Sequence, residues 1–393
     1  MIIDCDTHIL PRDSYERIEG PLAALAPRFT VDAAGFVNGT EFPGAPAPVP
    51  GSTPLPSPGS GCRYPGMYPG PERAQFFAGQ GIDRELVLPQ FSAMLFSYLV
   101  DAPLATAMAH SYNLSILDAM QAEPDRIIGA ALVALQDVDG AIAEIEWAHA
   151  NGFKAIAIDK VFPVAAHPFS ETLGSHRELW PFFARAAQLK MPLMMHSIQH
   201  GHRLSNHMFF QSDGLELFAP AEGHLSLVSL VTSGLLDDYP DLRFVYTEAG
   251  TAFIQPLVQK LDAALDKPPL NYDDEDASAR FHRRIVPGTE RSSAGKRLTA
   301  ADVYEVKNRK PASHYFRTNL FFTIETEEPG FAEAVEFLGA SQFLFATDYP
   351  HDDPGGRMKM KDVELLRDLP GMPEASKDLI RSGNAVALLG LDS

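Results

Sequence analysis

The chain has 393 residues, of which 45% are hydrophobic and 21% are charged, so it can fold around a large core. Its net charge of −19 argues against nucleic acid or an anionic membrane surface as the main partner. Two cysteines are too few for a disulfide framework, which fits a reducing cytoplasm. The apolar runs are shorter than the ~18 residues of a membrane span, and acidic residues interrupt the N-terminal run. We therefore expect neither a membrane span nor a signal peptide.

Short apolar runs typical of buried strands alternate along the chain with longer amphipathic stretches. Strands are predicted at 1–6, 84–90, 127–133, 153–158, 193–196, 243–247, 317–323 and 342–347. Helices are predicted at 102–123, 139–151, 176–190, 224–238, 253–265 and 329–339. Eight strand–helix units with near-continuous apolar strands predict an α/β fold, a TIM-like (β/α)8 parallel barrel, in one domain that spans residues 1–393.

Two segments interrupt this alternation. Residues 38–72 follow the first strand and are rich in Gly and Pro, which predicts an insertion that is neither helix nor sheet interior. Because it leaves the carboxyl end of a barrel strand, this insertion is either a solvated loop or a lid over the site. Residues 266–315 carry runs of charge and are predicted to be a second insertion, before the seventh strand. We interpret the charges as a solvated face, with a subunit contact as the alternative.

Polar residues end three of the predicted strands. Asp6 and His8 lie at the end of the first, His196 ends the fifth, and Asp348 follows the eighth. Because barrel enzymes hold their active sites at the carboxyl ends of the strands, we expect these four side chains to converge. Taken singly, each has an ordinary structural explanation, such as a hydrogen-bonded core residue. As a set, two imidazoles and two carboxylates suit zinc, manganese or iron.

Five segments together resemble the amidohydrolase superfamily, in its branch related to aminocarboxymuconate-semialdehyde decarboxylase. They span nearly the whole chain in the expected order, and they are Ile3–His8, the strand that ends in His196, Ser233–Val245, Pro311–Phe316 and Ala346–His351. The resemblance implies a distorted (β/α)8 barrel that binds one divalent metal ion through Asp6, His8, His196 and Asp348. It also implies a small-molecule substrate and a homodimer.

Two positions depart from the family pattern. The first ligand position is often His, and here it is Asp6. Decarboxylating relatives usually carry a catalytic His at the end of the sixth strand, where this chain has Glu248. A carboxylate there can accept a proton from water or bind a second metal ion, but it cannot act as a cationic proton donor. This substitution favours hydrolysis over decarboxylation, unless Glu248 only caps the following helix.

Four more residues are candidates for the site. His224 precedes the helix predicted at 225–236 and is either an acid, base or ligand, or simply a helix-start residue. His200 and His202 lie in a histidine-rich loop after the fifth strand, and His-rich tracts can bind metal. We interpret His200 as a second-site ligand or a substrate contact, and His202 as a substrate contact. Lys160, after the fourth strand, is predicted to contact a substrate carboxylate or to lie on the surface, rather than to bridge two metal ions.

These residues predict a metal-dependent hydrolase in the cytoplasm. The ion would lower the pKa of a bound water towards about 7, and the hydroxide would attack an amide, ester, lactone or thioester of an apolar, carboxylate-type small molecule. Asp348 would bind the metal and accept the proton of the water, while Glu248 and His224 would handle the second proton transfer or hold a second ion. The alternatives are non-oxidative decarboxylation of an aromatic or enolic carboxylic acid, and a barrel that binds a ligand without catalysis. The apolar segment 91–99 suggests a bulky, apolar substrate, or simply packs on the barrel.

Overall fold

The computed structural model describes residues 1–43, 64, 66–90, 101–160, 173–196, 214–248, 250–265, 310–324, 328–351, 362–369 and 371–392. Its main sheet has eight strands in the order β1-β4-β5-β6-β7-β8-β9-β10, and all neighbouring pairs are parallel. Their bounds are Ile3–Ile9 (β1), Arg84–Pro89 (β4), Ile127–Leu132 (β5), Ala155–Asp159 (β6), Leu193–His196 (β7), Phe244–Tyr246 (β8), Leu320–Ile324 (β9) and Phe343–Phe345 (β10). All eight predicted strands are therefore present.

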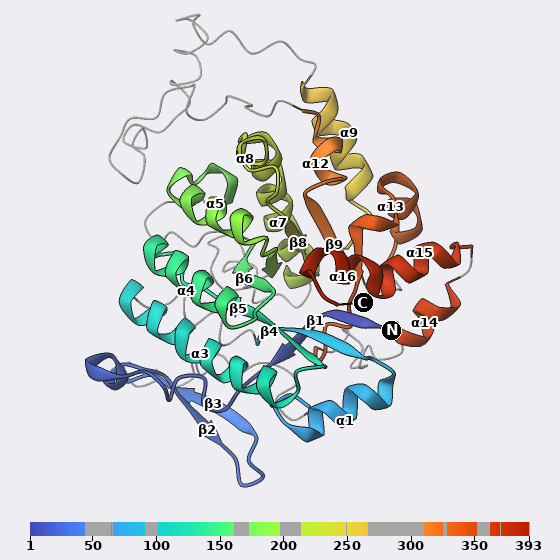
Figure 1. Ribbon diagram of the computed structural model, residues 1–393. Helices are drawn as coiled ribbons and strands as arrows, with labels where there is room; N and C mark the ends of the chain where they lie inside the picture. The colour runs from blue at the N-terminus through green and yellow to red at the C-terminus, as the bar shows by residue number, and fades with distance from the viewer. Residues whose placement is uncertain are drawn as a thin grey trace, which may run out of the picture.

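The first and the last strand of this sheet lie side by side. Thr7 pairs with Tyr349 in a parallel bridge, and the amide of His8 donates a hydrogen bond to the carbonyl of Tyr349 (2.7 Å). The sheet therefore curls into a nearly closed barrel, and the predicted (β/α)8 fold is confirmed (Figure 1). Strand ends that are hundreds of residues apart in the sequence meet at one mouth of this barrel.

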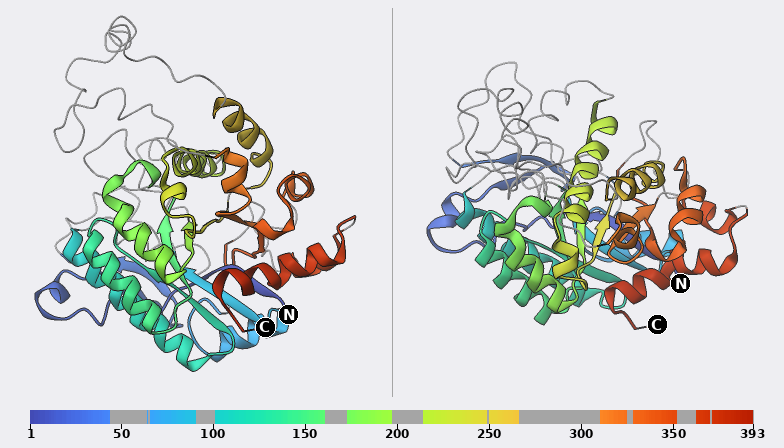
Figure 2. Two further views of the ribbon diagram at one scale, coloured as in Figure 1. Left: turned by 45° about the horizontal axis from the view of Figure 1, so that its top comes forward. Right: turned by 90° about the horizontal axis from the view of Figure 1, so that it is seen from above.

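Helices surround the strands on the outside, as Figure 2 shows from two further directions. The longer ones are α1 (Pro71–Gln80), α3 (Ala102–Ala122), α4 (Val138–Ala150), α5 (Trp180–Leu189), α7 (Gly214–Thr232), α9 (Ile254–Leu265) and α13 (Phe331–Leu338). Shorter ones are α8 (Leu235–Asp238), α12 (Ala312–Phe316), α14 (Asp362–Asp368), α15 (Glu374–Asp378) and α16 (Asn384–Leu389). Every described helix is too short or too polar to cross a bilayer.

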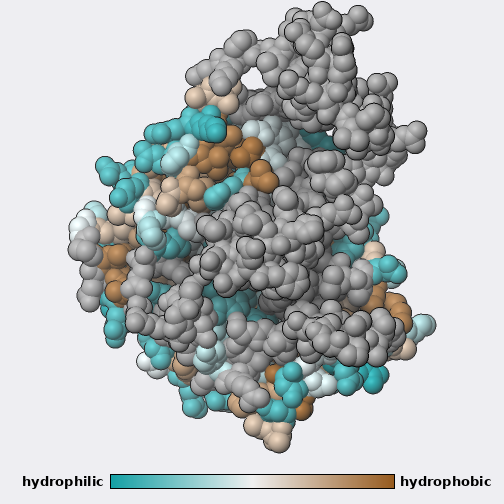
Figure 3. All heavy atoms as spheres, turned by 180° about the vertical axis from the view of Figure 1, so that it is seen from behind, coloured by the Kyte–Doolittle hydropathy of each residue, from teal (hydrophilic) through white to brown (hydrophobic). Residues whose placement is uncertain are grey.

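The core has two layers. The larger one packs the outer faces of the strands against the helices and is rich in aromatic rings. The smaller one fills the barrel itself with aliphatic and sulfur-containing side chains, from Cys5, Ala130 and Ala155 to the larger Leu86 and Met194, and α16 adds Leu389 to it. On the face shown in Figure 3, hydrophobic residues form separate patches between hydrophilic ones. The interior of the barrel is therefore closely packed below the mouth, and this packing gives the polar groups at the mouth a rigid support.

The first predicted insertion is wrong at both edges. Residues 38–41 belong to β3 (Val37–Glu41), which pairs antiparallel with β2 (Arg28–Val31). Helix α1 already begins at Pro71, because proline at the first turn of a helix loses no hydrogen bond. Residues 44–63 and 266–309, which hold most of both predicted insertions, lie outside the described residues. The lid and the subunit contact therefore remain predictions.

The helix predicted around His224 is also wrong at its start. Helix α7 begins ten residues earlier, at Gly214, so His224 lies inside a helix rather than before one. Pro220 and Gly223 lie inside α7, although both residue types normally disfavour a helix interior. Gly223 has a packing reason, since a Cβ built on it would lie 1.7 Å from Oη of Tyr246. Contact with the barrel thus outweighs local helix propensity here.

Candidate metal centre

Four predicted side chains meet at the carboxyl end of the barrel. Asp6 and His8 come from β1, His196 ends β7, and Asp348 follows β10. One nitrogen or oxygen atom from each can be chosen so that all four lie within 4.8 Å of one another. All four residues are buried, with at most 4% of each exposed. This is the convergence that the strand ends predicted.

A break in the register of β1 turns Asp6 and His8 into the barrel. Ile3 and Cys5 fill the barrel interior, so strict alternation would also direct residue 7 inward and residues 6 and 8 outward. The pairing with β4 shifts between Asp4 and Thr7, which adds one residue to β1. Such a bulge exchanges the two faces of a strand. From this point on, the even-numbered residues face the site.

The orientation of His8 is set by a backbone carbonyl. Its Nδ1 lies 3.0 Å from the carbonyl oxygen of Pro89, which can only accept a hydrogen bond, so Nδ1 carries the proton. Nε2 then faces the carboxylates, at 3.2 Å from Oδ1 of Asp348 and 3.7 Å from Oδ1 of Asp6. A carbonyl behind the imidazole is the usual arrangement for a histidine that ligates a metal through its other nitrogen.

Two acidic residues at the site adopt left-handed backbone conformations. Glu248, just after β8, has φ of 45°, and Asp348, just after β10, has φ of 53°. Residues other than glycine rarely occupy this region, and such strain tends to gather at functional sites. Asp348 contacts His8, while Oε2 of Glu248 lies 3.3 Å from Nε2 of His196. The suggestion that Glu248 caps the following helix is wrong, because α9 begins six residues later, at Ile254.

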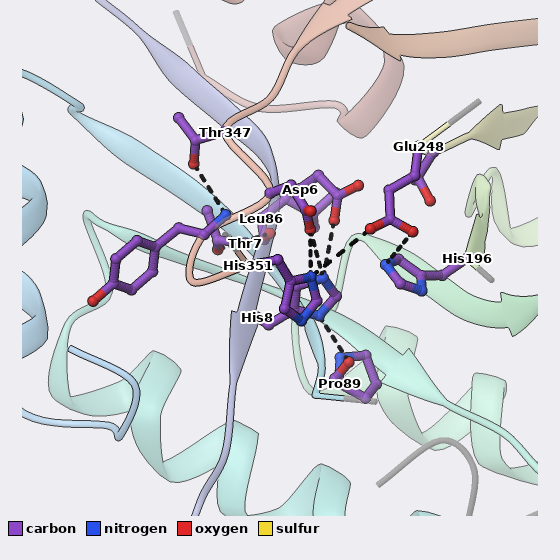
Figure 4. Close-up of polar contacts among 12 residues, drawn as sticks. Asp6, Thr7, His8, Leu86, Pro89, His196, Glu248, Thr347 and His351 are labelled. Atoms are coloured by element: carbon purple, nitrogen blue, oxygen red, sulfur yellow. Dashed lines mark hydrogen bonds and ion pairs between the residues drawn. The ribbon is translucent and has the colours of Figure 1, made fainter. Parts of the chain in front are cut away.

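The structure adds His351, to which the sequence reading gave no role. Its Nδ1 lies 2.8 Å from Oδ1 of Asp348 and 3.8 Å from Oε1 of Glu248, and its ring centroid is 4.3 Å from that of His8. His351, His8, Glu248 and Asp348 form a second group that could hold a metal ion. Figure 4 shows the side chains of His8, His351 and Glu248 pointing at one another, with His196 on the far side of Glu248. The sequence signals for His351 are its place three residues after Asp348 and at the end of the resembling segment Ala346–His351.

Burial and mutual charge shift the acidity of these groups. Burial, together with the charges of Asp348 and Glu248, raises the pKa of Asp6 well above its usual range. Burial also opposes ionisation of Asp348, but the charge and hydrogen bond of His351 and the hydrogen bond of His8 hold its pKa well below normal. Burial lowers the pKa of His196 to about 4, so its imidazole is neutral at neutral pH. A neutral imidazole is the form that binds metal.

The residues present fit a divalent cation. Neither carboxylate oxygen of Asp6 has a hydrogen-bond donor among the described residues, although both are buried. A buried acceptor without a donor is costly, and a buried carboxylate normally pairs with a cation or a metal ion. The surrounding donors are carboxylate oxygens and imidazole nitrogens, which suit manganese, iron or zinc. The cluster therefore has the chemistry of a metal centre.

A saturated network supports β1 from behind. The guanidinium of Arg73, which is fully buried, donates to both carboxylate oxygens of Glu85, to the carbonyls of His8 and Gly66, and to Oγ1 of Thr7. These bonds join α1 and β4 to the strand that carries Asp6 and His8. They fix the main chain of both side chains without entering the site.

A second support joins β1 to the end of β10. Asp4 is fully buried, and its carboxylate accepts hydrogen bonds from the amide of Asp6 (3.2 Å) and from the amide and hydroxyl of Thr347. The ladder between these two strands is limited to one bridge, at Thr7 and Tyr349. The Asp4 carboxylate therefore ties together the backbones that present Asp6 and Asp348.

The remaining candidates lie in different places. Lys160, directly after β6, is 1% exposed, so the alternative of a surface lysine is wrong. His224 belongs to neither metal-binding group, and its ring packs against Phe253 with the centroids 3.8 Å apart. His200 and His202 lie outside the described residues, as does the apolar segment 91–99.

A family model described as amidohydrolase matches residues 3–391, and the chain therefore belongs to the amidohydrolase family. The predicted superfamily is confirmed by this match, since it covers almost the entire chain.

Solved structures of similar fold include an amidohydrolase from Mycobacterium avium subsp. paratuberculosis, with 19% identity, a TM-score of 0.68 and 99% of each chain covered. A 5-carboxyvanillate decarboxylase from Novosphingobium aromaticivorans, complexed with manganese and 4-hydroxy-3-methoxy-5-nitrobenzoic acid, has 19% identity and a TM-score of 0.66, over 100% of this chain and 96% of that one. A dihydroxybenzoic acid decarboxylase from Polaromonas, with bound manganese and the inhibitor 2-nitroresorcinol, has 17% identity and a TM-score of 0.60, over 81% and 85%. At these identities the comparison establishes a shared fold.

Proposed function

We propose that this protein is a metal-dependent enzyme that removes carbon dioxide from an aromatic carboxylic acid without oxidation. The observation that carries the proposal is the buried cluster of two carboxylates and two imidazoles at the barrel mouth, with His351 hydrogen-bonded against it. The similar folds of decarboxylases for 5-carboxyvanillate and dihydroxybenzoic acid, both solved with manganese, support the choice of reaction. The sequence alone favours hydrolysis, with decarboxylation as the alternative, and these similarities make decarboxylation the first candidate.

Asp6, His8, His196 and Asp348 would hold the divalent ion, for which manganese is the first candidate. When bound, the ion would supply positive charge that neutralises the oxygens of an aromatic acid and orients its ring. The described side chains then determine what reaches that ring. The aromatic cluster of Tyr246, Phe253 and Phe322 packs around the end of β8, with ring centroids 6.0–6.3 Å apart, and limits water on that side.

Decarboxylation requires a proton to replace the departing carboxylate on the ring carbon. The carbon–carbon bond breaks, its electron pair stays with the ring, carbon dioxide leaves, and one proton adds to that carbon. Glu248 stands where decarboxylating relatives have a histidine, so the proton must come from another residue. His351 can supply it, because its Nδ1 lies close to the carboxylates of Asp348 and Glu248 and can hold a proton there. We assign the delivery of this proton to the pair of His351 and Asp348.

Hydrolysis of a carbonyl compound is the second candidate, and the position of Glu248 favours it. Its side chain is 23% exposed, whereas that of Asp348 is 5% exposed, so Glu248 is the more accessible proton acceptor. A carboxylate in that position can accept a proton from an attacking water. The two reactions use the same cluster and differ in whether the proton goes to a ring carbon or comes from water.

The test compares the two reactions on one preparation. The protein is stripped with a chelator, reconstituted with Mn²⁺, Zn²⁺ or Fe²⁺, and incubated with a panel of hydroxybenzoates and hydroxyisophthalates. We expect carbon dioxide release that needs the metal, and in D₂O one deuterium on the ring carbon that lost the carboxylate. Turnover of esters, lactones or amides without any release of carbon dioxide would replace this proposal by hydrolysis. Full activity in the stripped protein would contradict both.

A further inference from the structure

Lys160 is buried, and its ammonium has no hydrogen-bond acceptor among the described residues. It follows β6 directly, and its amide donates a hydrogen bond to the carbonyl of His196 (3.1 Å), which puts it beside the candidate metal centre. Its Nζ is buried and has no hydrogen-bond partner within the described parts of the chain. The ring of Tyr246 lies under it, with the centroid 4.6 Å away. A cation over an aromatic face retains its ability to donate hydrogen bonds to an anion.

Helix α7 contributes a second buried nitrogen that has no hydrogen-bond partner among the described residues. Ser226 donates a hydrogen bond to the carbonyl of Lys160, so α7 is attached to the end of β6. Two residues earlier on this helix, Nε2 of His224 is buried and also lacks a partner in the described regions. Burial and the charge of Lys160 lower the pKa of His224 to about 4, which leaves a neutral imidazole. Gly223 allows this close packing, because a Cβ there would collide with Tyr246.

We propose that Lys160 and His224 form a subsite for a second carboxylate of the substrate, next to the metal centre and separate from it. The inference rests on the proposed function and narrows its substrate class to aromatic acids with two carboxylates. One carboxylate reacts at the metal centre, and the other accepts hydrogen bonds from the Lys160 ammonium and the His224 imidazole. Tyr246 lines this subsite, with its ring centroid 4.6 Å from Nζ of Lys160 and 6.4 Å from the ring centroid of His224.

The competing explanation is that Lys160 only balances the charge of the metal centre. The negative charges of four carboxylates act on it and oppose the lowering of its pKa by burial, and they are those of Glu248, Asp6, Asp159 and Asp348. If this were its whole role, removing the ammonium would change metal affinity and would weaken all aromatic acids equally. A carboxylate subsite instead makes the loss depend on whether the ligand has a second carboxylate. This difference is the readout of the test.

The test uses two probes that differ by one group, salicylate and 4-hydroxyisophthalate, which is salicylate with a second carboxylate. Their affinities are measured by calorimetry on the Mn²⁺-loaded protein. We expect 4-hydroxyisophthalate to bind roughly 10- to 100-fold more tightly, the factor of a hydrogen bond to a charged group. Lys160→Met should abolish this preference, and His224→Gln should reduce it, while manganese content stays at the level of the wild type. Lys260→Met, on the exposed face of α9, is the matched control and should keep the preference.

Equal affinities of the two probes for the wild type would overturn the subsite, even if a Lys160 variant failed to fold. A preference that survives in Lys160→Met would overturn it as well. The measurement does not depend on turnover, so the two proposals can fail separately. Tight and lysine-dependent binding of 4-hydroxyisophthalate without carbon dioxide release would contradict decarboxylation alone. Release of carbon dioxide from salicylate without any preference in binding would contradict the subsite alone.

Discussion

Two buried cations, Arg73 and Lys160, flank the mouth of the barrel and differ in how they are paired. Every nitrogen of the Arg73 guanidinium donates to a described oxygen, including both carboxylate oxygens of Glu85. The Lys160 ammonium has no hydrogen-bond acceptor among the described residues. A saturated buried charge holds a fold together, whereas an unsaturated one is costly until a ligand arrives. Arg73 therefore supports the site, whereas Lys160 belongs to the part of the site that can bind a ligand.

The same contrast divides the carboxylates. Asp4 and Asp6 are two residues apart on β1, and both are buried. Asp4 is satisfied by Thr347 and by the amide of Asp6, so it ties strands together. Asp6 is left without donors in the described structure, and it faces the other members of the cluster. Partner count, more than burial, therefore distinguishes the two roles.

The largest effect should come from Asp348→Asn. The amide keeps the shape but loses the charge that faces the metal position, His8 and His351. We expect turnover to fall by at least about 10³-fold, as for other residues that act within one catalytic unit. Manganese affinity should fall as well, while circular dichroism stays unchanged.

The matched control for this variant is Asp241→Asn, at an exposed position before β8. It should keep full turnover. Retained activity in Asp348→Asn would refute the metal centre as the site of reaction.

The next largest effect concerns the saturated network. Arg73→Met leaves the buried carboxylate of Glu85 without its cation, and it should destabilise the fold by about 3–5 kcal/mol. The double variant Arg73→Met/Glu85→Leu removes both charges and should be more stable than the single one. Urea unfolding of the metal-free proteins measures these differences.

Arg185→Met serves as the control for Arg73, because Arg185 is paired with Glu146 at the surface (2.7 Å) and is 36% exposed. Its loss should change the free energy of unfolding by less than about 1 kcal/mol. Similar losses in the two single variants would mean that the buried network is no stronger than a surface ion pair.

Lys160→Met should have the opposite sign to Arg73→Met. It removes a buried charge that has no hydrogen-bond acceptor among the described residues, so in the presence of excess Mn²⁺ we expect the free energy of unfolding to rise by about 1–2 kcal/mol. Thermal unfolding of wild type, Lys160→Met and Lys260→Met measures this. A loss of stability in Lys160→Met alone would show that the ammonium has a structural partner.

The smallest effect is a pH dependence far from the site. Nδ1 of His110 on α3 lies 2.9 Å from the buried carboxylate of Glu144 on α4, and this hydrogen bond raises the pKa of His110 above its usual 6.5. Because the folded-state pKa is the higher one, the contribution is complete below pH 6.5 and is lost as the pH rises through the raised value. Wild type should therefore exceed His110→Gln in stability at pH 5.5 and lose that advantage at pH 9.

The difference should stay below about 1 kcal/mol, because the imidazole is 42% exposed. An advantage that grows with pH would mean that the neutral imidazole, and not the charged one, pairs with Glu144.

The order of the elements could be predicted because their signals are local. Apolar runs marked all eight strands, and the polar residues at the ends of β1, β7 and β10 identified Asp6, His8, His196 and Asp348. Strand ends of a parallel barrel meet at one mouth, so the convergence followed from topology alone.

What only the tertiary structure decided depends on register and on contacts between distant segments. The bulge that turns Asp6 and His8 inward arises from pairing with β4, and the need for glycine at position 223 inside α7 arises from the packing of this helix against Tyr246. The roles of His351 and Lys160 depend on neighbours that a linear sequence does not bring together. A single chain states which residue types are available, but whether a buried charge is paired or left for a ligand is settled by the packing of segments around it.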